Sequence, residues 1–156
     1  MITAHRGENT KEENEKRNGE LEKKIREAGY GFVKVKGRYV ENHGTENARP
    51  VDEHSYLVVG HKGDDKGHLL HFLKKQGEHY GQDSVLHKAH DEDNAKLHGT
   101  KEGGWPGKGE VHDVGKFHPN RAGEFHTVMK GSRTFSFESI RFLSAKSFFI
   151  REETDF

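Results

Sequence analysis

The residues best suited to acid–base chemistry lie between Lys116 and Lys130, in the stretch K-F-H-P-N-R-A-G-E-F-H-T-V-M-K. Histidine can act as a general acid or base near neutral pH, and arginine can stabilise an anion. His118 and His126 are therefore candidate catalytic residues, and Arg121 is a candidate ligand for an anion. The alternative is a solvated connection, because Pro119–Asn120 is an ordinary turn signal and no spacing here is diagnostic.

A second polar group lies near the N-terminus. A helical stripe of Leu21 and Ile25, extended backward by helical steps, reaches Asn18 and Asn14 instead of hydrophobic residues. Buried amides need hydrogen-bond partners. A ligand with phosphate or carboxylate oxygens would supply them, with arginine as a bidentate clamp. The candidate ligand-binding residues of this group are His5, Arg6, Asn14, Arg17 and Asn18. A purely structural network that ties the helix to neighbouring loops is the alternative.

Other motifs give weaker indications. His87–Asp93 and the pair His68 and His71 lack the spacing of a zinc site, so we expect no metal. Two H-G-T triplets, His43–Thr45 and His98–Thr100, resemble the paired motifs of two-histidine phosphoesterases over only six residues. The chain has no P-loop, nucleophile elbow or dinucleotide fingerprint, so no cofactor is expected.

Aromatic residues suggest where a partner protein would bind. Trp105, the single tryptophan, lies in the glycine-rich stretch Gly103–Gly109, and Phe148 and Phe149 lie in the charged C-terminal tail. Exposed aromatic side chains often dominate binding energy. Insertion of Trp105 into the core is an equally good reading of the same residue.

Composition limits the class of protein. The 156 residues fit one domain; 29% are apolar and 33% charged, with a mean hydropathy of -1.06, but ten Phe and four Tyr can build a small core. Lys+Arg and Asp+Glu both number 26, which argues against general coating of nucleic acid. The chain has no Cys, which excludes disulfides. We expect neither a signal peptide nor a membrane span.

Local patterns predict an α+β fold. Thr10 and Glu13 fit a capping box that starts a helix over 11–28, and a second helix is expected over 66–80. Short strands between and after the helices favour a mostly antiparallel sheet with both helices on one face, as a ferredoxin-like variant. Among the connections, Gly37 is expected to be a turn, 42–52 a loop and 99–124 a long flexible glycine-rich loop. Residues 1–142 would form one domain and 143–156 a tail.

Several segments together resemble a family of small uncharacterised proteins from bacteriophages and bacteria, a domain of unknown function. They are I-T-A-H-R, E-E-N-E-K-R-N and D-E-H-S-Y-L-V-V, with G-Q-D-S-V-L further on. The similarity covers roughly residues 2–90, with G-E-F-H-T and T-F-S-F-E in addition. The positions that carry it are Arg6, Asn14, Arg17, Asn18, Glu53, Ser55, Gln82, Asp83 and Ser84. The resemblance implies a phage accessory protein that acts in the host cytoplasm or in the virion.

These indications lead to three hypotheses about function. The leading one is a bacteriophage accessory protein that binds a host factor or virion components, so that a protein partner is expected. The alternative is a small enzyme acting on a phosphodiester or nucleotide, with Arg and Asn binding the anion and a His as acid or base. The second alternative is a minor structural protein of the virion.

Overall fold

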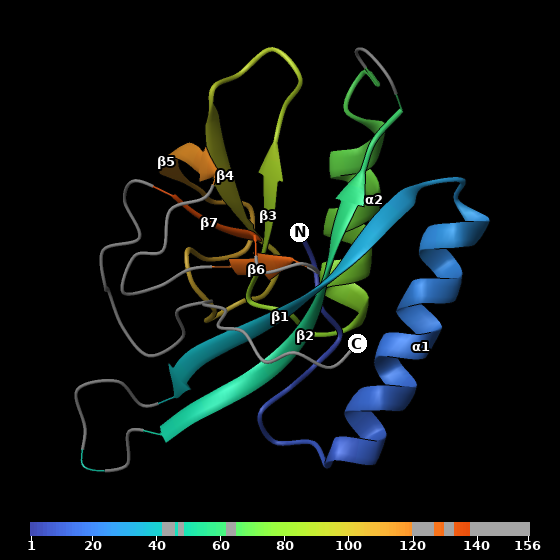
Figure 1. Cartoon of the computed structure of the whole chain (residues 1–156), viewed down its shortest axis with the longest axis vertical. Coiled ribbons are helices and arrows are strands. Elements are labelled where there is room, and N and C mark those ends of the chain that lie inside the picture. The colour runs from blue at the N-terminus through green and yellow to red at the C-terminus, as the bar shows by residue number, and fades with distance from the viewer. Residues whose placement is uncertain (42–45, 47–48, 62–64, 120–126, 130–132, 138–156) are drawn as a thin grey trace.

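The structure, a computed structural model, describes residues 1–41, 46, 49–61, 65–119, 127–129 and 133–137 (Figure 1). Its two helices are α1 (Lys11–Glu27) and α2 (His68–His79). Its seven strands are β1 (Gly31–Glu41), β2 (Arg49–Val59), β3 (Ser84–Lys88), β4 (Asn94–Gly99), β5 (Val111–Pro119), β6 (Thr127–Met129) and β7 (Arg133–Phe137). The predicted α+β class is confirmed.

Helix α1 begins as its sequence predicts. The Thr10 hydroxyl accepts a hydrogen bond from the Glu13 backbone, and the Glu13 carboxylate accepts one from the Thr10 backbone, which completes the capping box. After the last turn, Gly29 adopts a φ of 81° that a side chain would disfavour, and the chain leaves the helix. Leu21 and Ile25 are fully buried, so α1 presents one apolar face to the sheet.

Strands β1 and β2 form a long antiparallel hairpin that the sequence reading divided incorrectly. Gly37 pairs with Glu53 in the middle of the ladder, so it is a strand residue and not the predicted turn. The loop expected over 42–52 extends too far, because β2 already begins at Arg49. The pairing that overrides the local glycine and proline signals runs unbroken from Gly31–Val59 to Glu41–Arg49.

The N-terminal residues complete a ferredoxin-like core. Ile2 and Tyr56 exchange backbone hydrogen bonds of 3.0 and 2.7 Å as an antiparallel bridge, and the Leu86 amide donates to the Met1 carbonyl at 3.2 Å. The first residues therefore lie between β2 and β3. The order β3, N-terminal segment, β2, β1, with α1 and α2 as the connections, is the ferredoxin-like arrangement that the sequence predicts.

The remaining strands extend this core and curl back to it. The sheet order is β2-β1-β6-β7-β5-β4-β3, in which β6 pairs with β1 through Lys36 and Val128. Because the N-terminal segment joins the two outer strands of this order, hydrogen bonds connect the strands into a closed ring. Closure leaves one sheet face toward the helices and the opposite face toward the inside of the ring.

The two sheet faces have different cores. On the helix face, one buried cluster contains side chains of both helices and of the sheet, so α1 and α2 cover the same face (Figure 1). Its members include Leu21, Ile25, Tyr56, Leu73 and Val85. On the inner face, smaller clusters form around Val35 and around Ala95, Leu97 and Val114.

Helix α2 packs closely on the sheet at Gly77. A Cβ atom there would lie 2.8 Å from the Val85 side chain, so only glycine permits this approach.

The predicted long loop over 99–124 is wrong as a single segment. Strand β5 occupies Val111–Pro119 and pairs with both β4 and β7, so of the residues in this range that the structure describes, only those between β4 and β5 are irregular. The expected tail over 143–156 lies outside the described residues. The sequence reading missed β5 because its partners are distant in the chain or separated from it by glycine-rich turns.

Candidate functional site

The five predicted N-terminal residues do come together. We call their meeting place the N-terminal junction; it comprises Ala4–Arg6, His54, Tyr80–Asp83 and the α1 side chains Asn14, Arg17 and Asn18. The N-terminal segment, the first half of α1, strand β2 and the end of α2 all contribute to it.

Both asparagines of the junction bind backbone groups. Asn18, 5% exposed, accepts a hydrogen bond from the Ala4 amide at 2.9 Å and donates to the His54 carbonyl at 2.8 Å. Asn14 binds both backbone groups of Arg6 in the same way, at 2.9 and 3.0 Å. Their inward position is as the helical stripe indicates, and the partners of their amide groups are protein atoms.

Both arginines of the junction also reach backbone carbonyls. Arg17 donates to Ala4 at 2.8 Å and to Tyr80 at 2.6 Å, and its guanidinium lies over the Tyr80 ring. Arg6 donates to the Gly81 carbonyl and pairs with Glu8 at 2.7 Å, with Asp83 at 3.8 Å. An anionic ligand would have to compete with these carboxylates. Ligand binding by the five residues stays a prediction.

Hydrogen bonds of Gln82, Asp83 and Thr100 connect the junction to the sheet. Gln82 donates from its side chain to the His5 carbonyl at 2.9 Å, and its own carbonyl accepts the Thr100 hydroxyl at 2.6 Å. The Thr100 amide donates to the Asp83 carbonyl at 2.9 Å. Gln82 and Asp83, which are among the positions of the family resemblance, therefore lie in the same junction as the polar residues of α1.

His5 is one of two exceptions in the junction; the other is Tyr80, whose buried hydroxyl also has no hydrogen-bond partner among the described residues. The buried Nε2 atom of His5 finds no such partner within the same part of the chain, and the His5 ring centroid lies 5.8 Å from that of His54. Burial, followed by repulsion from His54 and Arg17, lowers the pKa of His5 to about 4. His5 is therefore neutral at physiological pH and has one ring nitrogen to offer.

A second polar feature lies on the inner face of the ring. Tyr56 and Val58 face the helices, so the alternation of strand β2 directs Leu57, Ser55 and Glu53 to the other face. We call Glu53 and Ser55 the β2 strip. They are 6% and 2% exposed, and the Ser55 Oγ atom finds no partner within the described part of the chain. A buried carboxylate beside an unsatisfied hydroxyl is a typical sign of a ligand site.

The predicted catalytic histidines remain untested. His118 pairs with Ser136 through the backbone of β5 and β7, but its side chain is outside the described set. Arg121, His126, Phe148 and Phe149 also lie outside the described residues.

Trp105 is half-buried. It packs against the cluster of Ala95, Leu97 and Val114, with its ring centroid 4.7 Å from that of His112. The indole therefore anchors the turn between β4 and β5 on the inner cluster and keeps part of its surface exposed. Partner binding through that surface stays a prediction.

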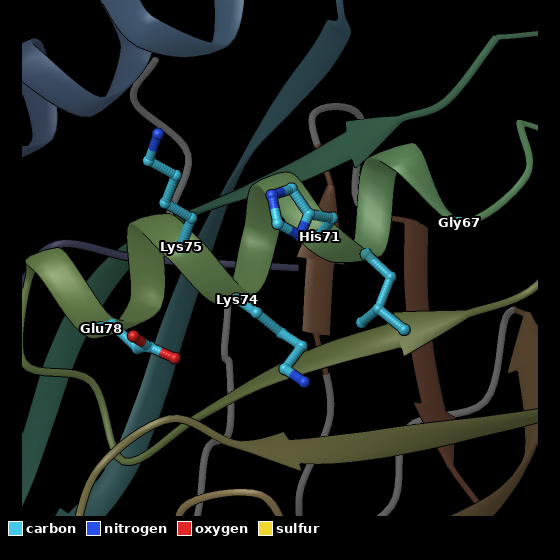
Figure 2. Close-up of a pocket in the computed structure, with 6 residues that line it drawn as sticks. Gly67, His71, Lys74, Lys75 and Glu78 are labelled. Carbon is cyan, nitrogen blue, oxygen red and sulfur yellow. The ribbon is translucent and has the colours of Figure 1, made fainter.

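A shallow hollow of about 420 Å³ follows the outer face of α2 (Figure 2). It is lined by Gly67, Leu70, His71, Lys74, Lys75 and Glu78.

No group of three possible metal-ligating residues gathers within the described residues, although the rings of His87 and His98 lie 6.0 Å apart. Over the same residues, no helix has the length and apolar character required to cross a membrane.

The β2 strip is the part of the site that sequence reasoning did not select. Glu53 and Ser55 were noted only among the positions of the family resemblance and as possible strand-entry residues. Their signal was two polar residues at alternating positions beside an apolar run, S-Y-L-V-V, which places both on one face of a buried strand.

Comparison with known families gives one result. A sequence model of the S-adenosylmethionine lyase family matches residues 1–141. No curated protein and no solved structure is significantly similar. A lyase is an enzyme, so the expectation of an accessory protein that acts by binding is wrong, and the enzymatic alternative is the better one. Because the match spans every described helix and strand, the chain belongs to the S-adenosylmethionine lyase family.

Proposed function

We propose that this protein is an S-adenosylmethionine lyase, an enzyme that breaks a carbon–sulfur bond of S-adenosylmethionine without adding water. The observation that carries the proposal is the family match over residues 1–141, which contains both the N-terminal junction and the β2 strip. The predicted enzyme acted on a phosphodiester or nucleotide; the family instead indicates an adenosine-bearing sulfonium compound.

The chemistry of the substrate limits what the protein must do. The sulfonium sulfur leaves with the bonding electron pair as a neutral thioether. The carbon that loses sulfur then either forms a bond to an oxygen of its own fragment or becomes part of a double bond after loss of a proton. Both routes need the substrate held in one conformation and water kept away from the carbon.

The β2 strip suits this task in charge and position. The substrate carries a sulfonium and an ammonium group, and a carboxylate is the side chain that attracts such cations. Glu53 supplies one at 6% exposure on the inner face of the ring, where attraction between charges is less screened than in water. Ser55, two residues on, supplies a hydroxyl that can donate and accept. We assign substrate binding to these two residues.

The N-terminal junction fixes the backbone of the β2 strip through His54, the residue between Glu53 and Ser55. Asn18 holds the His54 carbonyl, which lies between Glu53 and Ser55 in the chain. The junction therefore fixes the backbone on which both strip residues stand. His5, Arg6 and Arg17 remain candidates for contact with the substrate carboxylate.

The test is incubation of the purified protein with S-adenosylmethionine in water enriched in oxygen-18, with mass spectrometry at the first time points. We expect loss of substrate, appearance of a thioether, and a second fragment without the heavy oxygen. Heavy oxygen in the earliest product would instead identify a hydrolase. No turnover by a folded protein would contradict the proposal.

Matched variants locate the site in the same assay. Glu53→Gln keeps the size of the side chain and removes its charge, whereas Glu20→Gln makes the same change on the exposed surface of α1. Loss of turnover in the first variant alone supports the β2 strip. Equal turnover in both would place the active site elsewhere.

The biological setting is part of the proposal. Removal of a soluble metabolite fits an enzyme that acts in a cytoplasm, and the resemblance implies a bacteriophage protein that acts there in the host. Phage origin, host cytoplasm and the virion as an alternative location all remain predictions.

A further inference from the structure

Trp105 lies on the same face of the sheet as the β2 strip. The cluster that its indole contacts also includes Leu97 and Leu86, which pair with each other across β4 and β3. Val85, the neighbour of Leu86 in the strand, belongs to the cluster on the helix face. The alternation of β3 therefore directs Leu86, and with it the surface under the indole, to the inner face of the ring.

The inner face is continuous from this indole to the β2 strip. The Leu86 amide donates to the Met1 carbonyl at 3.2 Å, and the Met1 side chain packs with Leu57 in the other inner cluster. Leu57 follows Ser55 by two residues, on the same face of β2. From β4 to β2 this path crosses three strand spacings, about 14 Å along the sheet, and curvature shortens the direct distance. An elongated ligand, such as adenosine joined through sulfur to an amino acid, suits this span.

The turn that carries Trp105 is fixed on two sides. On the side of the N-terminal junction, the Thr100 amide donates to the Asp83 carbonyl at 2.9 Å. A Cβ atom at Gly104, the residue before the tryptophan, would lie 3.1 Å from the Cα atom of Asp83, so the turn packs directly on this segment. On the side of β5, the His112 ring centroid lies 4.7 Å from that of the indole. An aromatic ring that is already held in place loses little conformational entropy when a ligand binds.

The half-buried indole keeps an aromatic surface that the fold does not use. Nucleobases stack on such side chains because every base has a flat π-face, and stacking needs no particular hydrogen bond. We propose that Trp105 is a substrate-binding residue on which the adenine ring of S-adenosylmethionine stacks, with the sulfonium end of the substrate at the β2 strip. The identity of the ligand in this inference rests on the proposed function.

The emission of Trp105 tests the proposal in the full chain, because it is the single tryptophan. The protein is titrated with S-adenosylhomocysteine, a thioether analogue of the substrate, and separately with adenosine and with methionine. We expect the two adenosine compounds to change the emission saturably and to protect the indole from quenching by acrylamide. Methionine, which lacks the base, should do neither.

Two replacements separate stacking from anchoring of the turn, with affinity for S-adenosylhomocysteine measured by calorimetry. Trp105→Leu keeps an apolar side chain on the inner cluster and removes the aromatic face, so binding should weaken at least about fivefold. Trp105→Phe keeps a smaller aromatic face and should weaken binding less. The control is Phe72→Leu, which removes a partly buried aromatic ring on the helix face and should leave the affinity unchanged.

Three outcomes would overturn the proposal. They are an emission that adenosine, S-adenosylhomocysteine and S-adenosylmethionine all leave unchanged, equal affinity in Trp105→Leu and the parent protein, or equal weakening in the Phe72→Leu control. The emission of the parent protein decides the question even if a variant fails to fold. A saturable change without turnover would contradict the proposed reaction and leave the adenine site in place. Turnover with an unchanged emission would do the reverse.

Discussion

The N-terminal junction and the β2 strip are both buried and polar, but they differ in how their hydrogen-bonding groups are used. In the junction, Asn14, Arg17 and Asn18 find backbone partners at 2.6–3.0 Å. In the strip, the Ser55 hydroxyl finds none within the described residues, although the side chain is 2% exposed. Burial alone therefore does not separate structural residues from ligand-binding ones.

The difference identifies what each region is for. A satisfied buried amide contributes stability, and its loss exposes the desolvation cost of the groups that it leaves behind. An unsatisfied buried group costs stability and persists where binding or catalysis requires it. The junction should therefore respond to mutation in stability, and the strip should respond in substrate turnover.

The largest effect is expected for Asn18→Ala. This change leaves the Ala4 amide buried without a partner, at about 1–3 kcal/mol. It also removes one of two hydrogen bonds to the His54 carbonyl, which keeps the one from the Thr3 hydroxyl at 2.7 Å, at a further loss of about 1 kcal/mol. The free energy of unfolding, measured by urea titration, should fall by about 3 kcal/mol. Glu20→Ala on the exposed side of the same helix is the control. A loss below about 1 kcal/mol would show that water replaces the amide and that the junction is not structural.

Glu53→Gln should have the next largest effect, on turnover. Removal of the charge should lower kcat/KM for S-adenosylmethionine about 100-fold, equivalent to about 2.7 kcal/mol of transition-state stabilisation. The urea midpoint of the variant, measured alongside, separates a loss of turnover from a loss of folded protein. If Glu53→Gln is less stable but keeps its activity per folded molecule, Glu53 has a structural role and the proposed difference between the strip and the junction is wrong.

The pH dependence of stability should report His5. Its pKa is about 4 in the folded chain and near 6.5 in an unfolded one, so between these values the unfolded state binds more protons. The stabilisation that neutral His5 contributes is complete above pH 6.5 and is lost as the pH drops toward 4. The Met1 amino group, whose pKa burial lowers to about 5, adds its own slope in both proteins. His5→Gln should lose less stability over this interval in urea titrations. Burial also lowers the pKa values of His87 and His98, so the stability of His5→Gln should still fall in part as the pH drops.

The control for that experiment is His90→Gln, an exposed position. It should retain the parent slope between pH 6.5 and 4. An identical slope in His5→Gln and in the parent protein would show that His5 is accessible to water, so that its unpaired nitrogen carries no indication of a ligand.

Ser55→Ala is expected to have the smallest effect on stability, within about 0.5 kcal/mol, because no described group loses a partner. Binding of a substrate analogue, measured by calorimetry, should weaken about fivefold. A stability loss above about 1.5 kcal/mol with unchanged affinity would reverse the assignment and move Ser55 into the structural class.

Sequence patterns predicted the features that depend on neighbours in the chain. The capping box at Thr10, both helices and the inward position of Asn18 follow from spacing alone. The partners of Asn18 do not, because the Ala4 amide and the His54 carbonyl are brought there by the strand pairing of Ile2 with Tyr56. Gly37 and β5 were misread for the same reason: their structure is decided by distant strands. Function was missed because no residue set in this chain matches a known catalytic motif.

The position of the N-terminal segment between β2 and β3 has a consequence for synthesis of the chain. Ile2 pairs with Tyr56 and Met1 with Leu86, so these residues are synthesised well before the partners that they need. The ring cannot close until more than half of the chain has emerged. Until then the edges of β2 and β3 that flank this segment have unpaired backbone groups, which are the kind of surface that chaperones protect and that aggregation exploits.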